Sequence, residues 1–412
     1  MRKNAVDNTL TPIDGGVCAP NGFLASGFHC GISAYGTHSL GQSGAFSRDI
    51  REDISLVYAQ RRCSVACVFA QGNTVGAPIT VSKKHAQLGY ARAIFCNSGI
   101  ANVLQTDGKS AAEKICRAVA EKTGISKEEV LIASTGFIGE RYPTQAVLNG
   151  LDRLVQSLGG TNENSLSAAR GMMSTDSFVK QLSFSFSIGS YPCKIGVIFK
   201  GKTQVCPNMA TTLCFLTTDV NITPQMLQKA LSAATNEGFN MLCLDGASSP
   251  NDCVFILANG EAGNYKISCA DSEYKKFARI LCDVVSIVCK TIALEGDGKV
   301  LLCRVLGAKS KRTAYSLAKS LLSDYAFKVA CQQGKVDVNS VYAALCKEVD
   351  AVGVNQAEIS LRLDSSELLL AEDGKTLPLS QTLQTQILQT TALELIIKLH
   401  DGNYGATAYG NI

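Results

Sequence analysis

Apolar residues along this chain recur at two different spacings, and segments of the two kinds follow one another. Between residues 182 and 188, apolar side chains alternate strictly with serines, which is typical of a strand with one face in the core. Between residues 112 and 119, apolar side chains recur every three or four residues, which is typical of a helix. This mixture predicts an α/β protein and disfavours a helical bundle or an all-β barrel.

The same periodicity places the individual elements. Ser110 and Glu113 are expected to form a capping box at the start of one helix, and Gly124 to end it. Pro143 and Pro224 are expected near the starts of two more helices. Helices are therefore predicted from 110 to 123, from 143 to 158, from 224 onward and over 272–293. Strands are predicted at 130–133, 182–188, 194–199, 211–215, 253–257, 300–305 and 393–399.

Composition narrows the class of protein. Hydrophobic residues make up 46% of the 412 residues and charged residues 18%, a balance typical of folded chains. The formal net charge of +4 is spread without a basic stripe, so nucleic acid is not an expected partner. The N-terminus has no apolar core of a secretory signal, and the apolar stretch 280–293 contains Asp283 and Lys290, so no membrane association is expected. We expect a cytoplasmic protein.

Seventeen cysteines are scattered mostly within apolar runs, without a Cys-x-x-Cys pair. The four histidines stand alone, so the spacing of a zinc site is absent from the sequence and no metal is predicted. We interpret most of the cysteines as buried thiols.

Residues 196–203 fit the phosphate-loop pattern G-x-x-x-x-G-K-[ST]. A phosphate loop connects a strand to a helix, whereas these residues are themselves strand-like and Pro207 would interrupt a following helix. We therefore interpret the match as accidental. A helix beginning at Lys202 would contradict this interpretation.

The segment from Lys200 to Thr212 resembles the ornithine acetyltransferase (glutamate N-acetyltransferase) family of arginine biosynthesis. The family pattern is Lys-Gly-Ser-Gly-Met-x-x-Pro-Asn-Met-Ala-Thr, and Lys200, Gly201 and residues 207–211 match it. Further resemblance extends over nearly the whole chain: Gly16 to Pro20 with Gly22-Phe23, Asn97 to Asn102, Ala133 to Gly139, Ala168 to Arg170 with Thr175-Asp176, Phe215 to Asp219, and Asp245-Gly246 with Asn251-Asp252.

The resemblance implies that the chain cleaves itself between Ala210 and Thr211. The products would be an α chain of residues 1–210 and a β chain of residues 211–412, associated as α2β2. The implied fold is a layered sandwich of helices and mixed sheets in two domains. Cleavage would leave Thr211 with a free α-amine, whose reference pKa of about 7.7–8.0 lets it act as the base for the threonine hydroxyl.

The resemblance also assigns the other site residues. Thr135 and Gly136 match the residues that stabilise the oxyanion, and Thr175, Lys200, Thr211 and Asp297 match substrate-binding positions. Acetylornithine would acetylate Thr211, and glutamate would then take the acetyl group. No cofactor is implied, and acetyl-CoA is kept as an alternative acetyl donor.

Three departures from the family pattern bear on the substrate. Residues 202–204 are Lys-Thr-Gln in place of Ser-Gly-Met, Asp297 stands in place of a glutamate, and the chain stops at Ile412 without the family's tail. Two alternatives therefore stay open: a divergent self-cleaving acyltransferase with another amine substrate, and a catalytically degenerate member.

Overall fold

The computed structural model describes residues 10–32, 51–72, 74–202, 212–244, 249–295, 298–334, 336, 338–346, 357–363, 366–377 and 380–412. The chain divides into two compact units. Unit 1 comprises residues 1–201, 211–234 and 249–281, and unit 2 comprises residues 202–210, 235–248 and 282–412. Gly201, before the predicted cleavage point, and Thr212, after it, both belong to unit 1.

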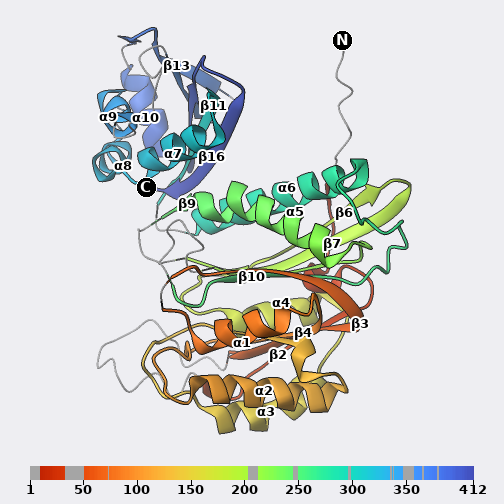
Figure 1. Ribbon diagram of the computed structural model, residues 1–412. Helices are drawn as coiled ribbons and strands as arrows, with labels where there is room; N and C mark the ends of the chain where they lie inside the picture. Colours follow the sequence, from red (N-terminus) through yellow and green to blue (C-terminus); the bar gives the residue numbers. More distant parts are fainter. Residues whose placement is uncertain are drawn as a thin grey trace. The chain divides into compact units, whose positions relative to one another are not determined.

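The strands of unit 1 form one mixed sheet in the order β1-β6-β7-β8-β10-β3-β4-β5, with β2 added beside β3 (Figure 1). The pairs β8/β10 and β4/β5 are parallel, and the other pairs are antiparallel. The strands are β1 (Thr11–Pro12), β2 (Phe23–Phe28), β3 (Ile54–Phe69), β4 (Tyr90–Asn97), β5 (Val130–Ser134), β6 (Gln181–Ile188), β7 (Tyr191–Lys200), β8 (Leu213–Thr218) and β10 (Cys253–Ala258).

Strand β3 joins two halves of this sheet: β1, β6, β7, β8 and β10 form one half, and β2, β4 and β5 form the other. One end of its 16 residues pairs with β10, and the other end pairs with both β2 and β4. The register shifts between Tyr58 and Cys63, where β3 carries exposed polar residues. A bulge of this kind bends a strand, so the two halves of the sheet can enclose other elements.

Helices fill the space between the sheet halves and cover their outer faces (Figure 1). Helix α2 packs against β5 and helix α3 against β2 and β3, and both helices share one core that contains Ile115, Leu151 and Phe95. A second core contains Ile79 of α1, Ala169 of α4 and Phe255 of β10. The helices are α1 (Ala77–Ala86), α2 (Gly108–Thr123), α3 (Thr144–Gln156), α4 (Asn162–Met172), α5 (Pro224–Glu237) and α6 (Ser272–Leu294). Helices α5 and α6 begin in unit 1 and end in unit 2.

Unit 2 contains a second mixed sheet in the order β14-β13-β12-β15-β11-β16-β9. Its strands are β9 (Leu242–Cys243), β11 (Val300–Ala308), β12 (Glu358–Leu363), β13 (Ser366–Glu372), β14 (Lys375–Thr376), β15 (Ala392–Lys398) and β16 (Tyr404–Asn411). Its helices are α7 (Lys311–Leu322), α8 (Tyr325–Gln332), α9 (Val338–Leu345) and α10 (Gln381–Gln389). The layered α/β architecture with mixed sheets is thereby confirmed.

Most predicted elements lie where the periodicity placed them, but the predicted capping box is wrong. Helix α2 begins at Gly108, so Ser110 lies inside its first turn, and Asp107 is the N-cap residue. The helix can begin earlier because Gly108 packs against Asn102, whose Nδ2 donates to the Gly108 carbonyl at 3.0 Å. Gly124 does end the helix, in the left-handed conformation.

The structure also accounts for the phosphate-loop match. Residues 196–200 lie within β7, and a Cβ atom on Gly196 would come within 1.8 Å of the Gly16 carbonyl oxygen. Gly196 therefore permits close packing of two backbone segments. Lys202 lies in a bend, and residues 203–211 lie outside the described residues.

Most of the described cysteines are buried, as predicted. None of the helices in the described part of the chain combines the length and the hydropathy needed to cross a membrane.

Candidate active site

The turn after β5 carries Thr135 and Gly136 and is fixed by a second turn, after β4. The Thr135 N–H donates to the Asn97 carbonyl and the Phe137 N–H to the Gly99 carbonyl, both at 2.9 Å. Gly136 has φ +130°, and a Cβ atom there would lie 2.1 Å from the Gly99 carbonyl carbon. Only glycine fits this position, because a side chain would clash with the neighbouring backbone.

The side chain of Asn97 forms hydrogen bonds that connect the two turns. Its Oδ1 accepts hydrogen bonds from Ser134 Oγ at 2.6 Å and from Tyr142 Oη at 2.9 Å, and its Nδ2 donates to the Ile100 carbonyl at 2.9 Å. Asn97 is fully buried and Tyr142 nearly so. Buried polar groups with all their partners in place are rigid, so the turn that carries Thr135 is pre-organised.

The outer side of this turn is open. Gly136 is exposed, and among the described residues its N–H has no hydrogen-bond partner. A backbone N–H that is not used within the fold, beside a hydroxyl, is the arrangement that stabilises a developing oxyanion.

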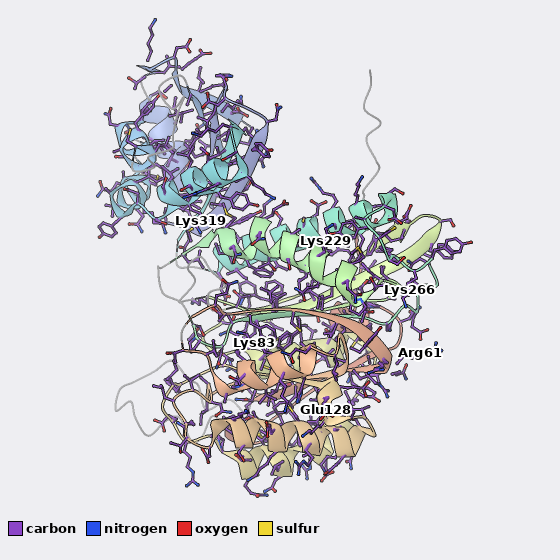
Figure 2. The ribbon with its side chains drawn as sticks, viewed as in Figure 1. Arg61, Lys83, Glu128, Lys229, Lys266 and Lys319 are labelled. Atoms are coloured by element: carbon purple, nitrogen blue, oxygen red, sulfur yellow. The ribbon has the colours of Figure 1, made fainter. Side chains whose placement is uncertain are left out.

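Lys200, the last residue of β7, reaches this turn. Its Nζ donates to Thr135 Oγ1 at 3.1 Å and to Ser174 Oγ at 2.6 Å. Lysines on the outside of unit 1, such as Lys83 and Lys229, are exposed (Figure 2), whereas Lys200 is only 3% exposed. Both acceptors are neutral hydroxyls, and the nearby Asp176 carboxylate acts on Lys200 through its charge, without a described hydrogen bond between the two side chains. A buried ammonium of this kind favours an anionic or strongly polarised ligand.

The hydrogen bonds of Lys200 also orient Thr135. An ammonium can only donate, so Thr135 Oγ1 must accept from it. The hydroxyl hydrogen of Thr135 is then left to donate elsewhere.

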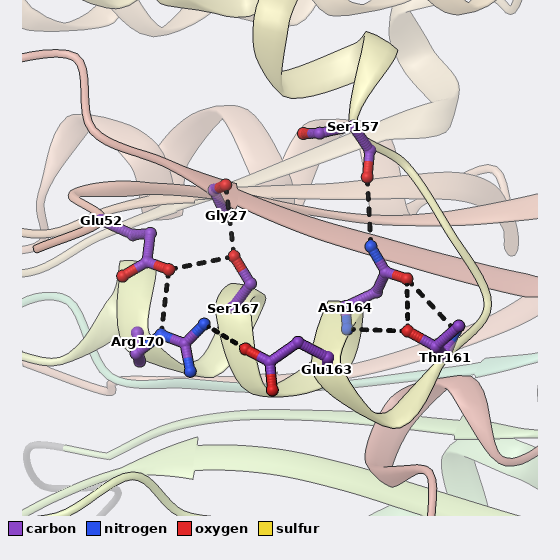
Figure 3. A network of polar contacts seen from close by, with 8 residues as sticks. All are labelled: Gly27, Glu52, Ser157, Thr161, Glu163, Asn164, Ser167 and Arg170. Carbon is purple, nitrogen blue, oxygen red and sulfur yellow. Dashed lines mark hydrogen bonds and ion pairs between the residues drawn. The ribbon is translucent and has the colours of Figure 1, made fainter.

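Helix α4 places Ser174, because the helix ends two residues earlier and is tied firmly to its surroundings (Figure 3). Arg170 donates to Glu52 at 2.9 Å and to Glu163 at 2.7 Å, and Ser167 donates to the Gly27 carbonyl at 3.3 Å. At the start of the helix, Thr161 and Asn164 form a capping box (Figure 3). These contacts fix the end of α4 against β2 and β3.

Asp176 anchors the loop after α4. Its Oδ2 accepts from the Ser174 N–H at 3.0 Å, and its Oδ1 accepts from the Gly201 N–H at 2.9 Å and from Lys180 Nζ at 2.6 Å. Burial on its own would raise the pKa of Asp176, but the charges of Lys200 and Lys180, together with hydrogen bonds from Lys180 and Ser174, lower it to about 2. Asp176 is therefore a carboxylate near pH 7.

The structure brings Thr135, Gly136 and Lys200 together, while Thr175 lies exposed in the loop between Ser174 and Asp176. Ala210, Thr211 and Asp297 lie outside the described residues, so their predicted roles stay predictions. On either side of the predicted cleavage point, the structure describes the chain up to Lys202 and again from Thr212.

Lys200 and Leu213 are register partners in the antiparallel pair of β7 and β8. The carbonyl of Thr212 accepts from the Cys253 N–H at 3.1 Å, which continues the pairing of β8 with β10. The residue that follows Thr211 is thus held at the end of the sheet where Lys200 lies.

Sequence reasoning did not assign roles to Ser174, Asp176, Lys180 or Asn97. Asp176 and Lys180 are four residues apart, but they do not lie in a helix, so the spacing alone gave no reason to pair them. One feature of the sequence could have indicated two of these residues: Asn97 and Asp176 lie in segments that resemble the ornithine acetyltransferase family.

Comparison with known proteins gives consistent similarities. Residues 40–411 match the ArgJ family. A protein of Symbiobacterium thermophilum named "Arginine biosynthesis bifunctional protein ArgJ" is 31% identical over 399 residues, which cover 96% of this chain and 95% of that protein. A protein of the same name from Caldanaerobacter subterraneus is 29% identical and covers 97% and 95% of the two chains. The "Glutamate N-acetyltransferase" of Methanococcus maripaludis is 29% identical and covers 97% and 94%.

Proposed function

Because the chain belongs to the ArgJ family, we propose that it is a glutamate N-acetyltransferase of arginine biosynthesis, which moves an acetyl group from N-acetylornithine to glutamate. The observation that carries the proposal at the level of residues is the hydrogen bond from Lys200 Nζ to Thr135 Oγ1 at 3.1 Å, next to the exposed residue Gly136. This cluster can stabilise the oxyanion of an acyl-transfer reaction.

The proposal includes self-cleavage between Ala210 and Thr211. The new α-amine of Thr211 takes the proton of its own hydroxyl, and Thr211 Oγ attacks the acetyl carbonyl of N-acetylornithine. The C–N bond breaks, the proton passes to the departing amine of ornithine, and acetyl-Thr211 remains. The amine of glutamate then attacks this ester, and N-acetylglutamate leaves while Thr211 Oγ regains a proton.

Each tetrahedral intermediate in this sequence places negative charge on the former carbonyl oxygen. The Gly136 N–H and the Thr135 O–H are the proposed donors to that oxygen. The position of Lys200 supports this assignment, because the ammonium fixes Thr135 Oγ1 as its acceptor and adds positive charge close by.

Substrate binding is proposed for Thr175, Lys200, Thr211 and Asp297. The exposure of Thr175 is consistent with this role, as are the neutral hydroxyls that accept the described hydrogen bonds of Lys200. Association of the two chains as α2β2 and a cytoplasmic location are also proposed, on the family resemblance alone.

Intact-mass measurement of the purified protein tests the cleavage. Two fragments are expected, with threonine at the new N-terminus, and Thr211→Ala should remain a single chain without acetyl transfer. Thr123→Ala, at the end of α2, is the matched control and should behave as the wild type. A single full-length chain in active protein would overturn the cleavage proposal.

Transfer from acetylornithine to glutamate tests the substrates, with acetyl-CoA supplied as the alternative donor. Turnover with acetylornithine and glutamate supports the proposal. A cleaved protein that transfers acetyl groups only to another amine would favour the divergent acyltransferase, and a cleaved protein without any turnover would favour the degenerate member.

A further inference from the structure

We propose that Asp176 is a positioning residue of the acetyl-transfer site: its carboxylate, paired with Lys180, fixes the backbone on both sides of the Lys200 ammonium. The inference rests on the proposed function in so far as Lys200 and Thr135 belong to the catalytic centre. It adds a residue pair whose two side chains are fully buried.

The two oxygens of Asp176 hold two different segments. Oδ2 accepts from the Ser174 N–H at 3.0 Å, and the hydroxyl of Ser174 in turn accepts from Lys200 Nζ at 2.6 Å. Oδ1 accepts from the N–H of Gly201, the residue that follows Lys200, at 2.9 Å. One carboxylate therefore sets both the backbone beside Lys200 and the hydroxyl that its ammonium contacts.

Lys180 keeps this carboxylate charged and in place. Its Nζ lies 2.6 Å from Asp176 Oδ1, and both side chains are fully buried. The Lys180 ammonium also lies 5.0 Å from the centre of the Phe178 ring, in a cation–π contact. The carboxylate is held by Ser174 and Gly201 and the ammonium by the Phe178 ring, so the ion pair has little freedom to move.

A direct chemical role for Asp176 does not fit its surroundings. All three hydrogen bonds described for its oxygens come from this chain's own donors, and its side chain has no exposed surface. A carboxylate with these partners holds its charge near pH 7, so it is a poor proton acceptor there. Asp176 therefore acts through Ser174, Gly201 and Lys200.

The double variant Asp176→Asn with Lys180→Met tests the proposal. It removes both members of the ion pair, so neither remains as a lone buried charge. The asparagine side chain has only one oxygen, so its NH2 group faces the N–H of either Ser174 or Gly201, and that N–H loses its acceptor. Displacement of Lys200 and Thr135 should lower kcat by up to about 100-fold, measured well below the unfolding temperature. Asp152→Asn with Lys122→Met, an exposed ion pair between α3 and α2, is the matched control and should keep the wild-type kcat.

A second readout follows Lys200 itself. The NMR signal of its ammonium, assigned by its loss in Lys200→Met, should shift or disappear in the double variant and stay unmoved in the control. A folded double variant with the wild-type kcat and an unmoved Lys200 signal would overturn the proposal. If the wild type transfers no acetyl group but the Lys200 signal still depends on Asp176, the proposed function fails while the positioning role stands.

Asp176→Glu covers the case in which the double variant does not fold. It keeps the charge and can still pair with Lys180, but its longer side chain displaces the acceptors of Ser174 and Gly201. A lower kcat with a shifted Lys200 signal is expected. Retention of both wild-type values would again overturn the positioning role.

Discussion

The ammonium of Lys200 and the hydroxyl of Thr135 are joined by a hydrogen bond of 3.1 Å, although the two residues lie 65 positions apart in the chain. The bond connects the end of β7 to the turn after β5, and those strands lie in different halves of the sheet of unit 1. Because the ammonium can only donate, it determines how the Thr135 hydroxyl is used.

Lys200→Met should lower kcat/KM by about 100- to 1000-fold, because the variant loses a preorganised charge next to the oxyanion site. The methionine keeps most of the apolar length of lysine, and the Asp176–Lys180 pair remains intact. Lys229→Met, at an exposed position on α5 (Figure 2), is the matched control. Steady-state kinetics with acetylornithine and glutamate provide the measurement. Equal kcat/KM values for the two variants would show that Lys200 has no role in the transfer.

Thr135→Val should lower kcat by about 100- to 1000-fold with little change in KM, because it removes one donor to the oxyanion while preserving the shape of the side chain. Thr135→Ser retains the hydroxyl and should keep most of the wild-type kcat. The ratio of the two kcat values separates the effect of losing the hydroxyl from any effect on the packing of the turn. If the valine and serine variants had the same kcat, the hydroxyl would not stabilise the transition state.

Gly136→Ala should lower the free energy of unfolding by more than about 3 kcal/mol or prevent folding, because the new Cβ would lie 2.1 Å from the Gly99 carbonyl carbon. Gly124→Ala is the matched control, because it also has a positive φ of 68° but no atom within 4 Å of a new Cβ. That control should cost about 1 kcal/mol. Urea unfolding measures both values. Similar losses for the two variants would mean that the turn can move away from Gly99.

Local patterns predicted the elements that alternate or repeat regularly. The hairpin of β6 and β7 was predictable because its apolar residues alternate and Gly189 with Ser190 marks the turn. Strand β3 was not predicted: its middle, around Arg61, is polar and exposed, and its pairing shifts register between Tyr58 and Cys63. Its long-range pairing with β10, β2 and β4 leaves no local signal.

The candidate site could be predicted only in part, for a similar reason. Gly136 and Thr135 lie in a motif that resembles a known family, so their roles could be carried over residue by residue. The contact between Lys200 and Ser174 spans 26 positions, and the bond between Asp176 and Gly201 spans 25. Such partners are chosen by the packing of α4 against the sheet, which periodicity does not reveal.

The lowered pKa of Asp176 predicts a loss of stability in acid. The unfolded chain binds this proton more readily than the folded protein, because the pKa is about 2 in the folded state against an ordinary value of 3.8. The stabilisation is therefore fully present above about pH 4 and lost as the pH falls towards 2, with a size of about 2 kcal/mol. The free energy of unfolding, measured in urea from pH 7 to pH 2.5, should fall more steeply for the wild type than for Asp176→Asn with Lys180→Met. Parallel curves would show that the Asp176 carboxylate has the same proton affinity in the folded and unfolded states, contrary to the contacts with Lys180 and Lys200.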